Sequence, residues 1–176
     1  MLTAMAKAEI TFEQPSRQAR AAETKKHRTR EKLIHAADDA LRDKGWSATV
    51  EDICDKAGIS SATFYSYYTS RYVLCLDAVL ELIVLPLENR GVRALPFDQS
   101  RDAFLKQCAG RKDLVRAALI GRLEAPGLDA LLSRVTGLLR NKGAIDALYL
   151  LDQVAMQQPV TPRTGKSLTG HITAKG

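Results

Sequence analysis

Cationic side chains are the most concentrated reactive groups near the start of this sequence. They lie in the run RQARAAETKKHRTR, opposed only by Glu23, and are Arg17, Arg20, Lys25, Lys26, Arg28 and Arg30. Guanidinium and ammonium groups at this density attract polyanions. The formal net charge of +6 gathers in this run and in residues 161–176, whereas residues 31–74 hold more acidic than basic residues. A basic end can also be a solvated tail, so the run needs a second observation.

The nucleophilic and metal-binding residue types form no recognisable cluster. His27, His35 and His171 are scattered, and no H-E-x-x-H motif, nucleophile elbow or phosphate-binding glycine loop is present. We therefore expect a protein that is not an enzyme and that needs neither a metal nor a cofactor. The alternative, an enzyme, would require a polar cluster inside a C-terminal cavity.

Cysteine usage and hydropathy bear on the compartment. Cys54, Cys75 and Cys108 form no C-x-x-C pair, and their odd number leaves one unpaired in any disulfide scheme. The first twenty residues lack the continuous apolar core of a signal peptide, and no stretch is long and apolar enough to span a bilayer. We expect a cytoplasmic protein without a membrane partner.

Helical signals begin at Thr29, a candidate N-cap. Apolar residues recur at helical spacing up to Leu41, and Gly45 supplies a stop. Thr49 is placed to cap a second helix with Asp52 at the capping-box position, and Gly58 ends that helix after two turns. A third short helix follows the cap at Ser60. Two short helices joined by a glycine turn are typical of a helix-turn-helix motif.

The stretch GWSATVEDICDKAGISSATFYSYYTSRYVL resembles the N-terminal DNA-binding domain of the TetR/AcrR family of bacterial regulators. The agreement runs from about Arg30 to Leu74 and includes the Gly58-Ile59 turn, the Ser-x-x-Thr-Phe-Tyr helix and the opening of the next helix at Arg71. The resemblance implies an all-α fold with a three-helix DNA-binding domain followed by a short C-terminal helical bundle. It also implies a transcriptional regulator, usually a repressor.

The resemblance assigns contacts to double-stranded DNA residue by residue. Small residues of the third helix would face bases, and flanking groups would meet phosphates or adjacent bases. The positions assigned to DNA are Thr49, Ser60, Ser61, Ala62, Thr63, Tyr65, Tyr67 and Arg71. Thr49 has the alternative of serving only as a cap, and Tyr68 matches a buried position. Because residues 31–74 hold more acidic than basic residues, we assign much of the attraction for DNA phosphates to Lys25, Lys26, Arg28 and Arg30.

Amphipathic helices are predicted after Arg71, at about 71–88, 99–109, 112–124, 128–141 and 144–157, with glycine and proline between them. The last two carry continuous apolar stripes, which by the resemblance would form a homodimer reading an inverted repeat. The stripe residues assigned to the dimer are Leu128, Leu131, Leu132, Val135, Leu138, Leu139, Ile145, Leu148 and Leu151. The pattern fits an intramolecular core equally well.

The predicted organisation has four parts. Residues 1–28 form a mobile basic arm, 29–74 the DNA-binding domain, 75–158 a helical domain for dimerisation and a ligand, and 159–176 a disordered tail. Family members often enclose a small-molecule inducer in the C-terminal domain, which here is short, and the residues of any ligand site are unknown from sequence. The alternative is a ligand-independent DNA-binding regulator or architectural protein controlled by protein partners. A filled C-terminal core would favour that alternative.

Overall fold

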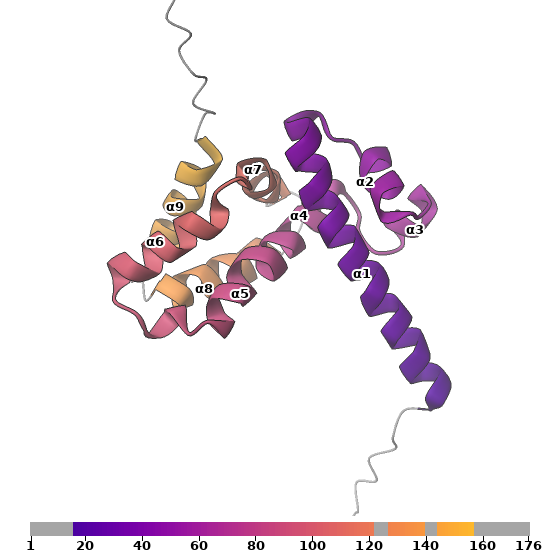
Figure 1. Cartoon of the computed structure of the whole chain (residues 1–176), viewed down its shortest axis with the longest axis horizontal. Helices are drawn as coiled ribbons and strands as arrows, with labels where there is room; N and C mark the ends of the chain where they lie inside the picture. Colours follow the sequence, from indigo (N-terminus) through magenta and orange to yellow (C-terminus); the bar gives the residue numbers. More distant parts are fainter. Residues whose placement is uncertain (1–15, 122–126, 140–143, 157–176) are drawn as a thin grey trace, which may run out of the picture.

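The computed structural model describes residues 16–121, 127–139 and 144–156. Every regular element in these ranges is helical, as predicted, and the chain is an all-α protein with an N-terminal helix-turn-helix domain followed by a helical bundle (Figure 1). The predicted tail, residues 159–176, and the first fifteen residues of the predicted arm lie outside the described residues.

The first helix is longer than its apolar pattern indicated. Helix α1 spans Arg17–Lys44, and the Ser16 hydroxyl caps it by accepting a hydrogen bond from the Ala19 amide. The expected start at Thr29 and the mobile arm over residues 17–28 are therefore wrong. The outer turns hold alanine, arginine, lysine, glutamate and glutamine, which have high intrinsic helix propensity. The apolar stripe begins later because it marks only the part of α1 that is buried.

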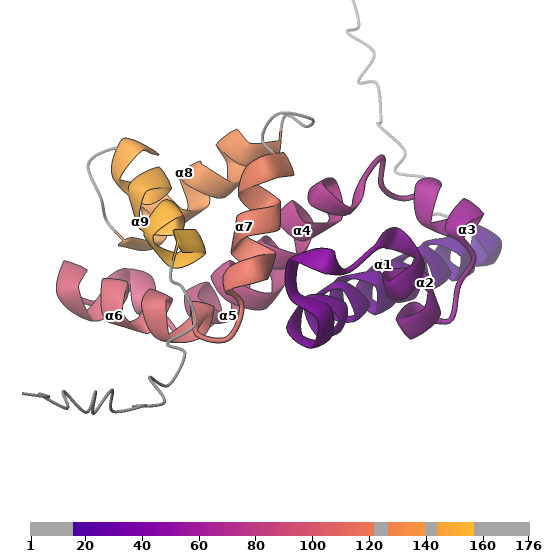
Figure 2. The same ribbon diagram turned by 90° about the horizontal axis from the view of Figure 1, so that it is seen from above.

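The helix-turn-helix lies against the inner half of α1. Helix α1 ends at Gly45, and the 3-10 turn η1 (Gly45–Ser47) leads to α2 (Val50–Ala57) and α3 (Ser61–Tyr65), as predicted. The inner face of α1 is buried against α2, α4 and α7 through Leu33, Ile34 and Ala37. Figure 2 shows α1, α2 and α3 together at one end of the molecule, with α6 and α9 at the other.

The segment predicted as one helix over 71–88 contains an interruption. Helix α4 (Arg71–Val79) passes through a π-helical turn, η2 (Leu80–Val84), into α5 (Leu85–Asn89). Pro86 has no amide hydrogen to donate to the Leu82 carbonyl, so the regular series of α-helical backbone hydrogen bonds is interrupted there. The Gln107 side chain donates to that carbonyl instead, at 3.0 Å. The irregular turn is thus held by a contact from a later helix.

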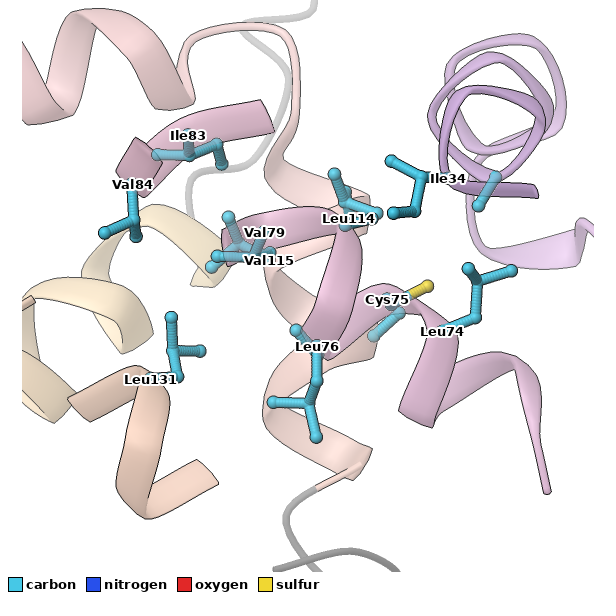
Figure 3. Close-up of a cluster of buried hydrophobic side chains, with 14 of the residues drawn as sticks. Ile34, Leu74, Cys75, Leu76, Val79, Ile83, Val84, Leu114, Val115 and Leu131 are labelled. Carbon is cyan, nitrogen blue, oxygen red and sulfur yellow. The ribbon is translucent and has the colours of Figure 1, made fainter. Parts of the chain in front are cut away.

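Helices α4 and α7 (Lys112–Gly121) form the centre of the molecule. A Cβ added to Gly121 would lie 2.8 Å from the Tyr72 carbonyl oxygen, so only glycine allows this approach. Around the crossing, Val79 from α4 lies beside Val115 from α7, and Leu114 from α7 lies toward Ile34 from α1 (Figure 3). The core is therefore continuous between the two domains.

The remaining helices complete the C-terminal bundle. After α5, the 3-10 turn η3 (Val92–Ala94) leads to α6 (Phe97–Cys108), and α8 (Gly127–Leu139) and α9 (Ala144–Met156) follow α7. Ile83 and Phe104, which lie on helices that could enclose an inner cavity, are fully buried, and Leu119 is nearly so. Four hollows on the surface of the described residues are lined by other side chains.

The dimer residues inferred from the α8 and α9 stripes are mostly intramolecular core. The positions buried within a single chain are Leu131, Leu132, Val135, Leu138, Leu139 and Leu151. A side chain already enclosed by its own chain cannot face a partner, so their assignment to the dimer is wrong. Leu148 is half-buried against the same core, and the side chains of Leu128 and Ile145 lie outside the described part of the chain.

Candidate nucleic-acid interface

The turn between α2 and α3 fixes the direction of α3. Gly58 adopts a left-handed conformation with φ of +65°, which side chains rarely tolerate. The next amide, from Ile59, donates to the Cys54 carbonyl at 3.1 Å, and Ile59 packs against the core. The chain leaves α2 in one defined direction, so the start of α3 is positioned by backbone geometry as well as by packing.

Helix α3 is anchored on one face and open on the other. Phe64 is fully buried, whereas Ala62 is exposed and the Tyr65 ring is 57% exposed. The Ser60 hydroxyl caps the helix by accepting from the Thr63 amide at 3.2 Å, and the two hydroxyl oxygens lie 3.0 Å apart. Predicted contact residues from Ser60 to Tyr65 thus come together on one short helix, with Ser61 half-exposed. The adjacent exposed Ser66 was not singled out in the sequence.

The two tyrosines after α3 have different environments. Tyr67 is half-buried and packs on the core. Tyr68 is 8% exposed, as expected for a buried position, and its hydroxyl donates to the Asp77 carboxylate at 2.5 Å. Burial raises the pKa of the Tyr68 phenol, and the neighbouring Asp77 carboxylate raises it further. Tyr68 therefore acts as an uncharged donor that joins the end of α3 to α4.

Arg30 completes this cluster and does not face outward. Its guanidinium donates to Asp77 through Nε at 2.8 Å and to Glu81 through Nη2 at 2.7 Å. The hydrogen bond to Asp77 is the main cause that raises the pKa of Arg30. The assignment of Arg30 to a phosphate is therefore wrong, because its donors hold α1 against α4 and η2. The sequence signal was the acidic pair Asp77 and Glu81, four residues apart on an otherwise apolar helix.

Arg71 is likewise engaged within the protein. Its guanidinium donates to the Ala48 carbonyl and to the Tyr72 hydroxyl, the latter at 3.2 Å. It also stacks on the Trp46 ring, 5.3 Å from the centroid, while Arg116 of α7 lies 4.9 Å from the same ring. The phosphate assignment of Arg71 is corrected accordingly: it fixes η1 to α4.

Thr49 is the expected cap of α2. Its hydroxyl accepts from the Asp52 amide at 3.2 Å, and the Asp52 carboxylate accepts from the Thr49 amide at 2.9 Å. The Lys44 ammonium and the Thr49 amide lower the pKa of Asp52. Thr49 itself is exposed, so a phosphate contact through its hydroxyl stays a prediction beside the confirmed cap.

The basic residues Lys25, Lys26 and Arg28 lie on the outer turns of α1 and are exposed. None of them forms an ion pair within the described part of the chain. Both views place these turns at the same end of the molecule as α3 (Figures 1 and 2). A helix rather than a mobile segment therefore carries these three cations, at the end of the molecule that also holds α3.

The described residues contain no group of three or more histidine, cysteine, aspartate or glutamate side chains arranged to hold a metal ion. None of the helices in these ranges combines the length and apolarity needed to cross a membrane.

Comparison with known proteins agrees with this geometry. Residues 33–78 match the model of the bacterial regulatory proteins of the tetR family. A search of the curated proteins found no match. The matched range covers the inner half of α1, the helix-turn-helix and α4, which carry the open face of α3 and its anchors. Residues 33–78 therefore form an N-terminal domain of the kind found in bacterial regulatory proteins of the tetR family, which indicates a DNA-binding transcriptional regulator.

Proposed function

We propose that the protein represses transcription by binding an inverted-repeat operator in double-stranded DNA as a homodimer. The single observation that carries this is the division of α3 into a buried Phe64 and an exposed face bearing Ala62 and Tyr65. Short side chains let a recognition helix approach the base edges in the major groove. A dimer seated on promoter DNA in the cytoplasm blocks polymerase without further chemistry.

The outer turns of α1 supply the phosphate attraction in this proposal. Lys25, Lys26 and Arg28 are exposed, whereas Arg30 is held inside the protein. Cations on a rigid helix meet phosphates at fixed spacing, and they release counterions when they do. Ser60, Ser61, Thr63 and Tyr67 add hydroxyl groups that meet bases or phosphates, so specificity is shared with DNA shape.

The homodimer face must differ from the buried stripes. We place it on the outer surface of α9, where Tyr149 is 65% exposed and Met156 is 78% exposed. These residues are seven apart and share one helix face. With Asp152 and Gln153 they line a surface hollow. Sedimentation should show a dimer that Tyr149→Arg and Met156→Arg dissociate, and Leu95→Arg, at another exposed apolar residue, should leave it intact.

The DNA proposal is tested by selecting binding sites from random duplex DNA with the full-length protein. We expect an enriched inverted repeat, lost in Tyr65→Ala and retained in Phe97→Ala, which removes an exposed aromatic ring from α6 at the opposite end of the molecule. Salt-sensitive binding without an enriched sequence, unchanged in Tyr65→Ala, would show that the basic turns act alone and would refute the assignment of α3.

The packed C-terminal core favours the second candidate, a regulator without an inducer in its interior. Ile83 and Phe104 are fully buried, and neither lines any of four hollows on the surface of the described residues. Under this candidate, DNA binding is constitutive or controlled from the surface. Crystals or solutions soaked with apolar gases such as xenon should then show no occupied interior site, and an occupied site among these helices would restore the inner-cavity alternative.

A further inference from the structure

The turn between α5 and α6 presents two arginines that the fold does not use. Gly91, with φ of +70°, begins this turn, and η3 completes it. Arg90 and Arg93 are exposed on either side of Gly91, and neither forms an ion pair within the part of the chain that the structure describes. An exposed cation without a partner contributes little to stability. Both charges are therefore available to another molecule.

A buried serine holds the backbone of this turn. Ser100 of α6 is fully buried, and its hydroxyl donates to the Val92 carbonyl at 2.9 Å and lies 3.3 Å from the Leu95 carbonyl oxygen. The Val92 side chain is buried as well, whereas Leu95 is 37% exposed. A backbone that is already fixed loses little further conformational freedom when a partner binds. The exposed side chains of the turn thus stand on a preorganised support.

A hollow of about 600 Å³ adjoins the turn. Its lining residues come from α5, η3 and α8 and are Glu88, Arg93, Ser133, Arg134, Gly137 and Leu138. A Cβ added to Gly137 would meet nothing within 4 Å, so the surface of α8 is open there. The hollow is larger than any amino-acid side chain, so a side chain of a partner can enter it.

The charges in this hollow favour a carboxylate. Arg134 binds the Glu88 carboxylate through Nε, at 3.3 Å, and through Nη2. Its side chain is 36% exposed, and its Nη1 atom forms no hydrogen bond with a described residue. Glu88 compensates the charge of Arg134, but no described acid compensates that of Arg93. A carboxylate in the hollow would meet the free cation of Arg93 and the unused N–H groups of Arg134.

Apolar side chains and acids lie next to the two free arginines. Phe97, at the start of α6, is 45% exposed, and the Arg101 guanidinium lies 6.0 Å from its ring centroid. Asp98 and Asp102 on the same helix are exposed and share Arg101 as their partner. These acids disfavour a nucleic-acid backbone or an anionic membrane, because both would bring further negative charge to α6. A protein segment can place its carboxylates on the arginines and its apolar side chains elsewhere.

We propose that this surface docks an acidic segment of a partner protein, in which carboxylates are interspersed with large apolar side chains. The docking surface consists of Arg90, Arg93, Leu95, Phe97 and Arg134. One carboxylate enters the hollow and binds Arg93 and Arg134, a second pairs with Arg90, and an apolar side chain packs on Leu95. Figure 1 shows the turn between α5 and α6 at the far end of the molecule from α3. Docking therefore leaves α3 open and does not rest on the proposed function.

The first test selects short random peptides, displayed on phage, with the full-length protein. Counter-selection with the Arg93→Gln variant removes peptides that bind other basic surfaces, such as the outer turns of α1. We expect the remaining peptides to combine aspartate or glutamate with large apolar residues. If no peptide remains after counter-selection, or if the remaining peptides lack acidic residues, the proposal is overturned.

The second test measures the affinity of a synthetic selected peptide by calorimetry. Arg93→Gln and Arg90→Gln should each weaken binding about tenfold, and so should replacing the peptide's acids by amides. Lys106→Gln, at an exposed lysine of α6 outside the hollow, should leave the affinity unchanged. Leu95→Ser should weaken binding about fivefold through lost apolar contact. These variants lie at exposed positions and should unfold like the parent, so unchanged affinity in Arg93→Gln would exclude this surface.

Other occupants of the surface are measured with the same variants. Binding to phosphatidylserine vesicles that is lost in Arg93→Gln and Leu95→Ser would assign the surface to a membrane and overturn the proposal. A smaller assembly of Leu95→Arg in sedimentation would assign it to a second copy of the chain, with the same consequence. Absence of sequence-specific DNA binding by the parent protein would refute the proposed function, while the peptide titrations would still decide whether the docking surface exists.

Discussion

The two halves of α1 belong to one continuous helix but have different surroundings. Residues 17–28 are exposed on all sides, and none of the cations Lys25, Lys26 and Arg28 pairs with a described acid. From Arg30 onward the helix is tied to α2, α4 and α7 by Leu33, Ile34 and a set of ion pairs. The difference separates the exposed cations, to which we assign the attraction for DNA, from the packed segment that stabilises the domain, so each segment can be changed alone.

Shortening a buried side chain in the inner half of α1 should have the largest effect on the free energy of unfolding. Leu33 is fully buried, so Leu33→Ala removes packing and leaves a cavity, and we expect a loss of about 3 kcal/mol in the free energy of unfolding. Urea denaturation measures it. The matched change on the outer half, Lys26→Ala, should stay within about 0.5 kcal/mol of the parent. A similar loss in both variants would mean that the outer turns are packed as well.

Neutralising the outer half should affect DNA binding and leave stability alone. The triple change of Lys25, Lys26 and Arg28 to Gln should lower affinity about 10- to 100-fold at low salt and reduce the slope of log affinity against log salt by about 2 to 3. The control triple Arg90, Arg93 and Lys106 to Gln removes equally exposed cations from the C-terminal half. Equal slopes in the two triples would remove the outer half from the DNA interface.

Arg30 marks the border between the halves. Arg30→Gln leaves Asp77 and Glu81 without their shared cation, and we expect about 1–2 kcal/mol of destabilisation because the pairs are only partly exposed. The neighbouring exposed Arg28→Gln should be neutral in the same denaturation experiment. If Arg30→Gln is also neutral but weakens DNA binding, the original assignment of Arg30 to phosphate contact must be restored.

The last residue of α1, Lys44, should show the smallest effect, since its pair with Asp52 is at the surface. Lys44 lowers the pKa of Asp52 below its ordinary 3.8. Because the pKa of Asp52 is lower in the folded state than in the unfolded state, its ionised form stabilises the folded protein at pH values above the ordinary pKa. This stabilisation is lost as the pH falls through the folded-state pKa. We therefore expect Lys44→Gln to be slightly less stable at neutral pH and the difference to close on acidification.

Much of the fold followed from patterns along the chain. Thr49, Gly58 and Ser60 specify local caps and a left-handed turn, so α2 and α3 were predicted close to their bounds. The start of α1 was missed because the expectation relied on an apolar stripe, whereas the outer turns form through propensity and the Ser16 cap. An apolar stripe indicates which part of a helix is buried. Exposed turns can still be helical where they extend a helix that is buried further along.

The candidate site was predictable only where roles depend on local position. Ala62 and Tyr65, which were assigned to DNA from their positions in the third helix, are exposed on α3, and their contacts with DNA stay predictions. The roles of Arg30 and Arg71 were not, because their partners lie 47 and 23 residues away, and a cation in the sequence does not show which acid or carbonyl will meet it. The same limit applies to the apolar stripes of α8 and α9. The sequence pattern of a stripe is the same whether it packs against helices of its own chain or against a partner subunit.

The π-helical turn η2 has a consequence for how insertions and deletions would act on this protein. In that turn the Leu85 amide donates to the carbonyl of Leu80, five residues back, so the segment contains one residue more than an α-helix of the same number of turns. One extra residue in a regular α-helix would rotate all that follows by about 100°, whereas the wide turn takes up that residue, so α5 keeps nearly the helical phase of α4. A regular α-helical turn at this place would need one residue fewer to keep the helix-turn-helix domain and the C-terminal bundle in the same relative rotation.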